Sequence, residues 1–224
     1  MSAKPLAVLF DIDGTLITTG GAGAVAWRLA FEELYGIPAD IGAFTDAGMT
    51  DPEVGFKTFT AAIGHTPSAG ELDEVIAARI RHLPKAVAEA DGYSVLAGVT
   101  ELLPRLAEAG YLLGLTTGGG EQAARIKLER AGLNRYFGFG GFGSDSPDRV
   151  TLTKRAIERA QAINGNGLGP ANCFVVGDTP LDITAAAGAG AVSVGVASGH
   201  YSVDALRAAG ADHVVASLEE GLPL

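Results

Sequence analysis

The sequence predicts an α/β protein in which a doubly wound, Rossmann-like parallel sheet forms the core and an α-helical cap domain is inserted into it. Two patterns support this fold class. In the second half of the chain, short apolar runs alternate with amphipathic stretches, which is typical of the alternating strands and helices of a doubly wound sheet. The apolar character of these runs is continuous, as expected for parallel strands that helices cover on both faces.

Each predicted strand is a short run of apolar, β-branched or small residues that ends at a turn signal. These runs cover residues 6–10, 111–116, 137–142, 173–176 and 192–196, and a weaker run begins at His213. The amphipathic stretches predict helices over residues 100–110, 121–132, 151–163, 181–190 and 202–210. Gly110, Gly132 and Gly210 stand where a helix end favours glycine, and Ser202 is a candidate N-cap.

The first strand departs from this rhythm, because about 80 residues of mainly helical pattern separate it from the second strand. Apolar residues at helical spacing within this segment predict three or four amphipathic helices. We therefore expect a helical cap domain over residues 17–94, inserted into a core domain formed by residues 1–16 and 95–224.

The charge balance of the 224-residue chain limits its partners. Sixteen Lys and Arg against 26 Asp and Glu give a formal net charge of −10, and no run of basic residues could form a surface for nucleic acid or an anionic membrane. No apolar stretch approaches the roughly 20 residues of a membrane span, and the N-terminal sequence is unlike a signal peptide. With a single cysteine, Cys173, an internal disulfide is excluded. We therefore expect a cytoplasmic protein that binds neither nucleic acid nor membrane.

Aspartates directly follow two of the predicted strands. Asp11 and Asp13 belong to a D-x-D-G-T motif after the first strand, while Asp178 follows the fourth strand and Asp182 stands four residues later. The second pair alone would equally suit a helix N-cap and an exposed carboxylate. Because parallel strands end at one edge of a sheet, the four carboxylates are expected to share one crevice, where they would repel one another without a cation. Oxygen ligands of this kind favour Mg²⁺.

A third motif follows the second strand, where Thr116, Thr117 and Gly118 precede a helix that is predicted to begin near Glu121. A hydroxyl group and exposed backbone N–H groups in front of a helix can bind phosphate. A flexible glycine-rich turn is an equally good interpretation of this motif taken alone.

In this order, the three motifs resemble those of the haloacid dehalogenase superfamily of phosphohydrolases, and the resemblance spans nearly the whole chain. It implies that Asp11 is the nucleophile that becomes an aspartyl phosphate, and that Asp13 is the general acid and base. It also implies that Thr117 and Gly118 bind the phosphate group.

The same resemblance implies that Asp178 and Asp182 hold Mg²⁺, together with Asp11 and Asp13. The insertion is similar to the family's helical cap of the C1 kind, as in phosphoglycolate phosphatase and beta-phosphoglucomutase relatives. The true dehalogenases lack the second aspartate of the first motif and need no metal, so Asp13 favours a phosphohydrolase.

The sequence departs from the family pattern where relatives carry Lys-Pro before the helix that leads to the Asp178 motif. Pro147 stands near the expected lysine. A cation is still needed to neutralise the nucleophile and the incoming phosphate, and Arg149 is the first candidate for it, with Lys154 the second. An exposed charge at the start of a helix is the alternative for either residue.

A second departure lies in the insertion, where many relatives read Gly-Arg-Thr-Asp. Here Met49 stands in place of the arginine, ahead of Thr50 and Asp51. The loss of a cation that could meet a substrate carboxylate argues against phosphoglycolate as the substrate. Thr50 and Asp51 are candidate substrate contacts, and Asp51 also suits a loop-capping role.

Together these features predict a Mg²⁺-dependent hydrolase that cleaves a small phosphorylated metabolite, a phosphate monoester, through an aspartyl phosphate. A phosphomutase acting on a sugar phosphate would use the same core chemistry, so the motifs do not separate the two activities. A non-catalytic sensor of a phosphorylated ligand is the third alternative. The large insertion and the presence of Asp13 argue against that alternative.

Overall fold

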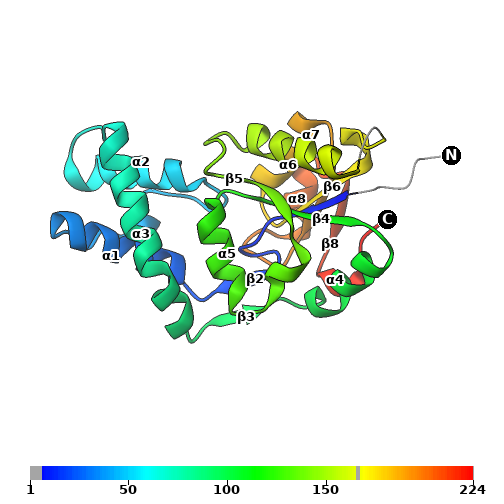
Figure 1. The fold of residues 1–224 in the computed structure, drawn as a ribbon, viewed down its shortest axis with the longest axis horizontal. Coiled ribbons are helices and arrows are strands. Elements are labelled where there is room, and N and C mark those ends of the chain that lie inside the picture. Colours follow the sequence, from blue (N-terminus) through cyan, green and yellow to red (C-terminus); the bar gives the residue numbers. More distant parts are fainter. Residues whose placement is uncertain (1–6, 165–166, 224) are drawn as a thin grey trace.

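The computed structural model describes residues 7–164 and 167–223, and its centre is a parallel sheet (Figure 1). The strands of the sheet are β1 (Ala7–Phe10), β4 (Leu112–Thr117), β5 (Phe139–Phe142), β6 (Cys173–Gly177), β7 (Val192–Val196) and β8 (His213–Val215). Their order is β5-β4-β1-β6-β7-β8. All the strands predicted for the core are present, including the glycine-rich one, whereas Leu6 lies outside the described residues.

The register of the sheet aligns the ends of its central strands. Phe10 of β1 lies opposite Leu115 of β4 on one side and Val176 of β6 on the other. Because all three strands run in the same direction, the residues that follow them emerge at one edge of the sheet. This edge therefore receives Asp11 after β1, Gly118 after β4 and Asp178 after β6.

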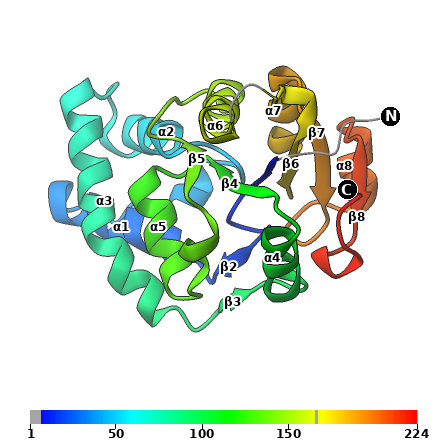
Figure 2. The same ribbon diagram turned by 45° about the vertical axis from the view of Figure 1, so that its right-hand side comes forward.

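Helices cover both faces of the sheet, which confirms the doubly wound fold (Figure 2). They are α4 (Val99–Glu108), α5 (Glu121–Glu129), α6 (Arg149–Asn164), α7 (Pro180–Ala189) and α8 (Val203–Ala208). Val8 and Phe10 of β1 belong to a core cluster shared with α4 and α5, whereas Ala7 and Leu9 pack with α6 and α7. Alternate residues of β1 thus face opposite layers, and all are apolar because both layers exclude water.

The helical insertion is confirmed, and its three helices gather beside the sheet (Figure 1). They are α1 (Ala22–Tyr35), α2 (Asp51–Ile63) and α3 (Ala69–Glu89). Trp27, Phe31 and Phe59 belong to a separate hydrophobic cluster within the insertion. The insertion therefore packs around side chains of its own.

Two short strands connect the insertion to the sheet domain. β2 (Ile17–Thr19) and β3 (Tyr93–Val95) pair in an antiparallel ribbon, with Thr18 opposite Ser94. This ribbon was not predicted, because each of its strands is only three residues long and includes polar residues, so neither forms an apolar run. The ribbon falls at the predicted limits of the insertion, and the division of the chain into domains at those limits stays a proposal.

The described helices are too short or too polar to cross a membrane. The longest of them, α3, has 21 residues but carries seven charged side chains. A span needs roughly 20 predominantly apolar residues, so even this helix does not qualify.

Candidate active site

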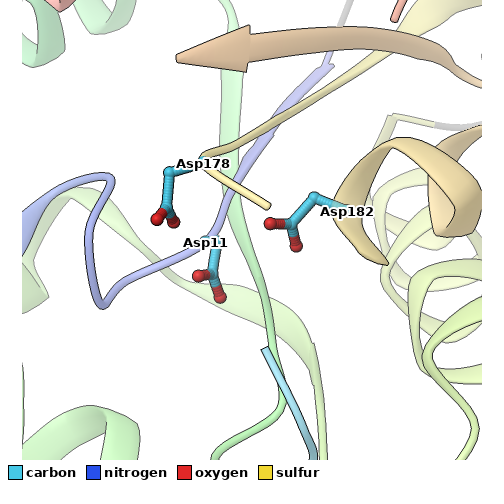
Figure 3. A group of neighbouring side chains, drawn as sticks. All are labelled: Asp11, Asp178 and Asp182. Carbon is cyan, nitrogen blue, oxygen red and sulfur yellow. The ribbon is translucent and has the colours of Figure 1, made fainter. Parts of the chain in front are cut away.

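Three aspartates from separate elements meet at the carboxyl edge of the sheet (Figure 3). Asp11 follows β1, Asp178 follows β6, and Asp182 lies in the first turn of α7. One carboxylate oxygen from each residue lies within 4.8 Å of the others, and all three residues are buried. The structure thus brings three of the four predicted carboxylates into one cluster, and the fourth, Asp13, lines the same cavity.

Backbone contacts fix two of these aspartates. The Asp11 N–H donates to the Val176 carbonyl at 2.9 Å and so continues the pairing of β1 with β6. Asp182 closes a capping box at the start of α7, where its Oδ2 accepts from the Thr179 N–H at 3.1 Å and from the Thr179 hydroxyl at 2.7 Å. Because the capping box uses Oδ2, the other oxygen of Asp182 is left to face the cluster.

Burial and mutual repulsion disfavour the charged forms of these carboxyl groups. Burial, followed by the charges of Asp182 and Asp178, raises the pKa of Asp11 well above its usual range. Burial and the charge of Asp182 raise the pKa of Asp178 to about 7, against an opposing hydrogen bond from the Thr15 hydroxyl. The cluster therefore concentrates negative charge that a cation would neutralise.

The donor set of the cluster fits a hard divalent cation such as Mg²⁺, which takes oxygen ligands and is usually held by few carboxylates. Gly14 makes room for the Asp178 carboxylate, because this residue has a φ of +84° and a Cβ there would lie 2.3 Å from Asp178 Oδ2. Asp11, Asp178 and Asp182 are the residues that would hold the ion.

The Asp13 carboxylate is not part of this cluster, although the sequence placed it there. Its Oδ2 instead accepts a hydrogen bond from Lys127 Nζ at 2.5 Å, and its side chain is 44% exposed. Asp13 thus lies beside the cluster as a separate, accessible carboxyl group, and a position among the metal ligands is not supported for its side chain.

Lys127 is a residue that sequence reasoning missed. It lies on α5, its side chain is 8% exposed, and it lines the same cavity as Asp11. The only sequence signal is its position at helical spacing from Ala123 and Ala124, which are both buried. A lysine on the buried side of a helix requires an acidic partner, and only the fold shows that this partner is Asp13.

Arg149 joins the carboxylate cluster from the start of α6. Its guanidinium donates to Asp182 Oδ1 and lies 3.7 Å from Asp11 Oδ1. Burial would lower its pKa, but the charges of Asp182 and Asp11 outweigh burial and raise it. The other candidate, Lys154, is exposed further along α6 and does not line the cavity, so the structure brings only Arg149 to the site.

The candidate phosphate-binding loop, which begins with Thr117 and Gly118, follows β4 as the sequence predicts. Thr117 is buried at the end of that strand, and Gly118 comes next. The Gly118 carbonyl accepts from the Asp51 N–H at 2.8 Å, and a Cβ at Gly118 would lie 2.5 Å from the Met49 carbonyl oxygen. Glycine is therefore required here because the helical insertion packs directly against the loop.

Asp51 and Thr50 attach the insertion to the core. Asp51 Oδ2 accepts from Arg79 Nη1 at 2.6 Å and from the Gly120 N–H at 2.8 Å. The hydroxyl of Thr50, which is fully buried, donates to the Pro147 carbonyl at 3.2 Å. Thr50 does not line the cavity, so the structure does not place it for substrate contact, whereas Asp51 lines the cavity with one oxygen already engaged.

A cavity of about 420 Å³ lies over the cluster, between the core and the insertion. Its lining includes Asp11 and Asp13, Thr117 and Gly118, and Asp178. This volume is within the range of small-molecule sites. The site can therefore receive a compact substrate directly above Asp11.

Comparison with known proteins shows which protein family this sequence matches. The family model of haloacid dehalogenase-like hydrolases matches residues 5–190. The chain is 31% identical over 223 residues to "Probable phosphatase IndB" of Dickeya dadantii (strain 3937), covering 97% of this chain and 91% of that protein. It is 28% identical to hexitol phosphatase A of Escherichia coli (strain K12), covering 95% and 91%. It is 32% identical to phosphoglycolate phosphatase of Rhodospirillum rubrum, covering 92% and 85%.

Proposed function

Because the chain belongs to the haloacid dehalogenase-like hydrolases and is a phosphatase of that family, we propose that it cleaves small phosphate monoesters with Mg²⁺ and through an aspartyl phosphate on Asp11. The observation that carries the proposal is the buried meeting of Asp11 with Asp178 and Asp182, next to the Arg149 guanidinium. A nucleophilic carboxylate at the floor of a small cavity, with cations beside it, suits attack on a dianionic ester.

Binding of the phosphoryl group is assigned to groups that surround Asp11. Thr117 offers a hydroxyl, Gly118 a backbone N–H, and Arg149 the planar fork that matches phosphate oxygens. A bound Mg²⁺ would reduce the repulsion between Asp11 and the phosphoryl oxygens. These donors would stabilise the charge on the phosphoryl group during transfer.

The reaction proceeds in two displacements at phosphorus. In the first, an Asp11 oxygen forms a bond to phosphorus while the bond to the ester oxygen breaks, and the Asp13 carboxyl group gives its proton to the departing alkoxide. In the second, the Asp13 carboxylate takes a proton from water, whose oxygen attacks phosphorus and releases inorganic phosphate. Asp11 is then a carboxylate again. Lys127 holds the Asp13 carboxyl group at the cavity through their 2.5 Å hydrogen bond.

The helical insertion, residues 17–94, acts in this proposal as a cap. Its support is a set of contacts to the core: Asp51 with Gly118 and Gly120, and the Gly48 carbonyl with Arg149 Nη1 at 3.0 Å. A closed cap would exclude water during the first displacement and keep the aspartyl phosphate from side reactions.

We also propose that the protein works in the cytoplasm on a phosphorylated metabolite, with no nucleic-acid or membrane partner. The net charge of −10 and the cavity of about 420 Å³ support a small ligand over a polyanion. The single, buried Cys173 suits a reducing compartment.

Removal of divalent cations is expected to abolish hydrolysis of p-nitrophenyl phosphate, and added Mg²⁺ should restore it, because the cluster needs a counter-charge. Binding can also be measured without turnover. Mg²⁺ should raise the thermal midpoint of the wild type, since a ligand of the folded state stabilises it. The rise should be lost in Asp178→Asn and kept in Asp204→Asn, whose side chain is 94% exposed. Equal Mg²⁺ shifts in wild type and Asp178→Asn would contradict the metal assignment.

Lys127→Met is expected to lower kcat about 100-fold, with a smaller effect on KM, because Asp13 would lose the contact that orients it for proton transfer. Lys127→Arg should recover part of the loss, since it keeps a cationic donor. Lys154→Met, on the exposed side of α6, is the matched control and should resemble the wild type. If Lys127→Met keeps the kcat of the control, Lys127 does not position Asp13.

A further inference from the structure

The cavity has few positively charged side chains that could bind a second anionic group of a substrate in addition to the phosphoryl group. Among the described residues that line it, the carboxylates are Asp11, Asp13, Asp51 and Asp178, and the lysine and arginine side chains are Lys127 and Arg149. Both cations already contact carboxylates, Lys127 with Asp13 and Arg149 with Asp182 and Asp11. A second anionic group on a substrate would therefore face a lining with more negative than positive side chains.

Besides the charged side chains, the lining includes residues with uncharged polar groups. Thr18 and Thr19 of β2 and Ser198, which follows β7, bring hydroxyl groups to it. The Ser198 hydroxyl donates to the Gly14 carbonyl at 2.7 Å, so its oxygen can still accept a hydrogen bond. His200 adds an exposed ring that can donate or accept. Such groups match substrate hydroxyls, whereas a carboxylate moved out of water among them would lack a counter-ion.

Position 49 lies beside the loop that follows β4 and carries Thr117 and Gly118. The carbonyl before it, from Gly48, accepts from Arg149, and the Thr50 N–H after it donates to Glu53 Oε2 at 3.0 Å. Its own carbonyl oxygen would lie 2.5 Å from a Cβ at Gly118. The backbone here is thus held from both sides, and the residue that it contributes to the lining at this position is the uncharged Met49.

The nearest lysine to this position does not supply the missing charge. Lys57 Nζ lies 3.5 Å from the Met49 sulfur, but Lys57 is exposed on α2 and is not part of the lining. The side chain of Met49 also packs against the aromatic cluster of the insertion. Lys57 therefore lies outside the cavity, behind Met49.

We infer that the substrate is the phosphate monoester of a neutral, hydroxyl-rich alcohol, a polyol or sugar phosphate, and that Met49 helps to select it over phosphorylated carboxylic acids. The inference rests on the proposed function. Its chemical basis is that the cavity lining offers hydroxyl and imidazole partners to the leaving group. Among the lining residues that the structure describes, the lysine and arginine side chains are the two that face the catalytic aspartates.

Matched pairs of esters test the substrate class. Glycerol 3-phosphate differs from 3-phosphoglycerate, and 2-hydroxyethyl phosphate from 2-phosphoglycolate, by a hydroxymethyl group in place of a carboxylate. The kcat/KM of the neutral member should exceed that of its partner by about tenfold or more, the effect of one unpaired charge. Equal values, or a preference for the acids, would overturn the inference while p-nitrophenyl phosphate is still hydrolysed. Loss of all hydrolysis, that of p-nitrophenyl phosphate included, would instead contradict the proposed function.

Two substitutions test the role of Met49. Met49→Arg restores the cation of the Gly-Arg-Thr-Asp pattern and should shift the ratio of kcat/KM for 3-phosphoglycerate over glycerol 3-phosphate about tenfold toward the acid. Met49→Leu keeps the position uncharged and should leave that ratio within about twofold of the wild type. The ratio does not depend on the fraction of folded enzyme, because both esters meet the same sample. Identical ratios in the two variants would remove Met49 from selection.

Discussion

Asp11→Asn is expected to abolish hydrolysis of p-nitrophenyl phosphate, with a loss in kcat of about 1,000-fold or more, because an amide oxygen is a far weaker nucleophile than a carboxylate. The fold should persist, since the side chain keeps its shape. Burial and neighbouring carboxylates raise the pKa of Asp11, so its charge opposes folding at neutral pH. Without added metal, Asp11→Asn should therefore melt at a higher temperature than the wild type.

The covalent step can be observed directly. With p-nitrophenyl phosphate the leaving group needs little help from an acid, so Asp13→Asn should still form the aspartyl phosphate and then hydrolyse it slowly. Acid-quenched Asp13→Asn should accordingly carry label from a phosphorus-labelled ester, and Asp11→Asn should carry none. Asp91→Asn, an exposed control, should turn over like the wild type. Labelled protein in Asp11→Asn would assign the nucleophile to another residue.

Product analysis separates hydrolysis from the phosphomutase alternative. Incubation with a sugar phosphate should release inorganic phosphate in proportion to substrate consumed. Accumulation of an isomeric sugar phosphate would show transfer to a second hydroxyl instead of to water.

Replacing Arg149 is expected to give the second largest effect. Arg149→Met should lower kcat/KM for p-nitrophenyl phosphate about 100-fold or more, because it removes a preorganised donor beside the transferred phosphoryl group. It should also lower the thermal midpoint, since Asp182 and Asp11 would keep their buried charges without the guanidinium between them. Added Mg²⁺ should restore more of the stability than of the activity.

Two further variants test whether the effect of Arg149→Met comes from the guanidinium group of Arg149. Arg149→Lys keeps the charge but loses the planar fork, so it should retain intermediate activity. Arg155→Met, on the exposed side of the same helix, should change neither measurement. An Arg149→Met enzyme as active as Arg155→Met would show that the guanidinium is only a structural partner of Asp182.

The core of the fold was predictable because its strands are buried on both faces. Runs such as 173–176 are continuously apolar, and a turn and a helix follow each of them, so pattern and structure coincide. The β2–β3 ribbon left no such pattern. It forms by pairing between residues about 75 positions apart, and neither the length nor the composition of its strands reveals that pairing.

The site was predictable for residues at the ends of neighbouring parallel strands, because such ends lie at the same edge of the sheet. Asp11, Thr117 and Asp178 emerge together because a parallel register fixes their positions. Lys127 and the orientation of Asp13 were not predictable, since they depend on the rotation of α5 against the sheet. That Arg149, and not Lys154, reaches the aspartates follows from its place at the first residue of α6, which the sequence pattern located two residues too late.

The pairing of Asp51 with Arg79 bears on how product leaves. Both residues belong to the insertion, and Arg79 also stacks on Trp27 of the insertion, 5.0 Å from the ring centroid. If the insertion moves away from the core, Asp51 loses its hydrogen bonds with Gly118 and Gly120 but retains its ion pair with Arg79. At this contact, the movement that frees phosphate therefore separates no pair of opposite charges, so its barrier here should respond little to ionic strength.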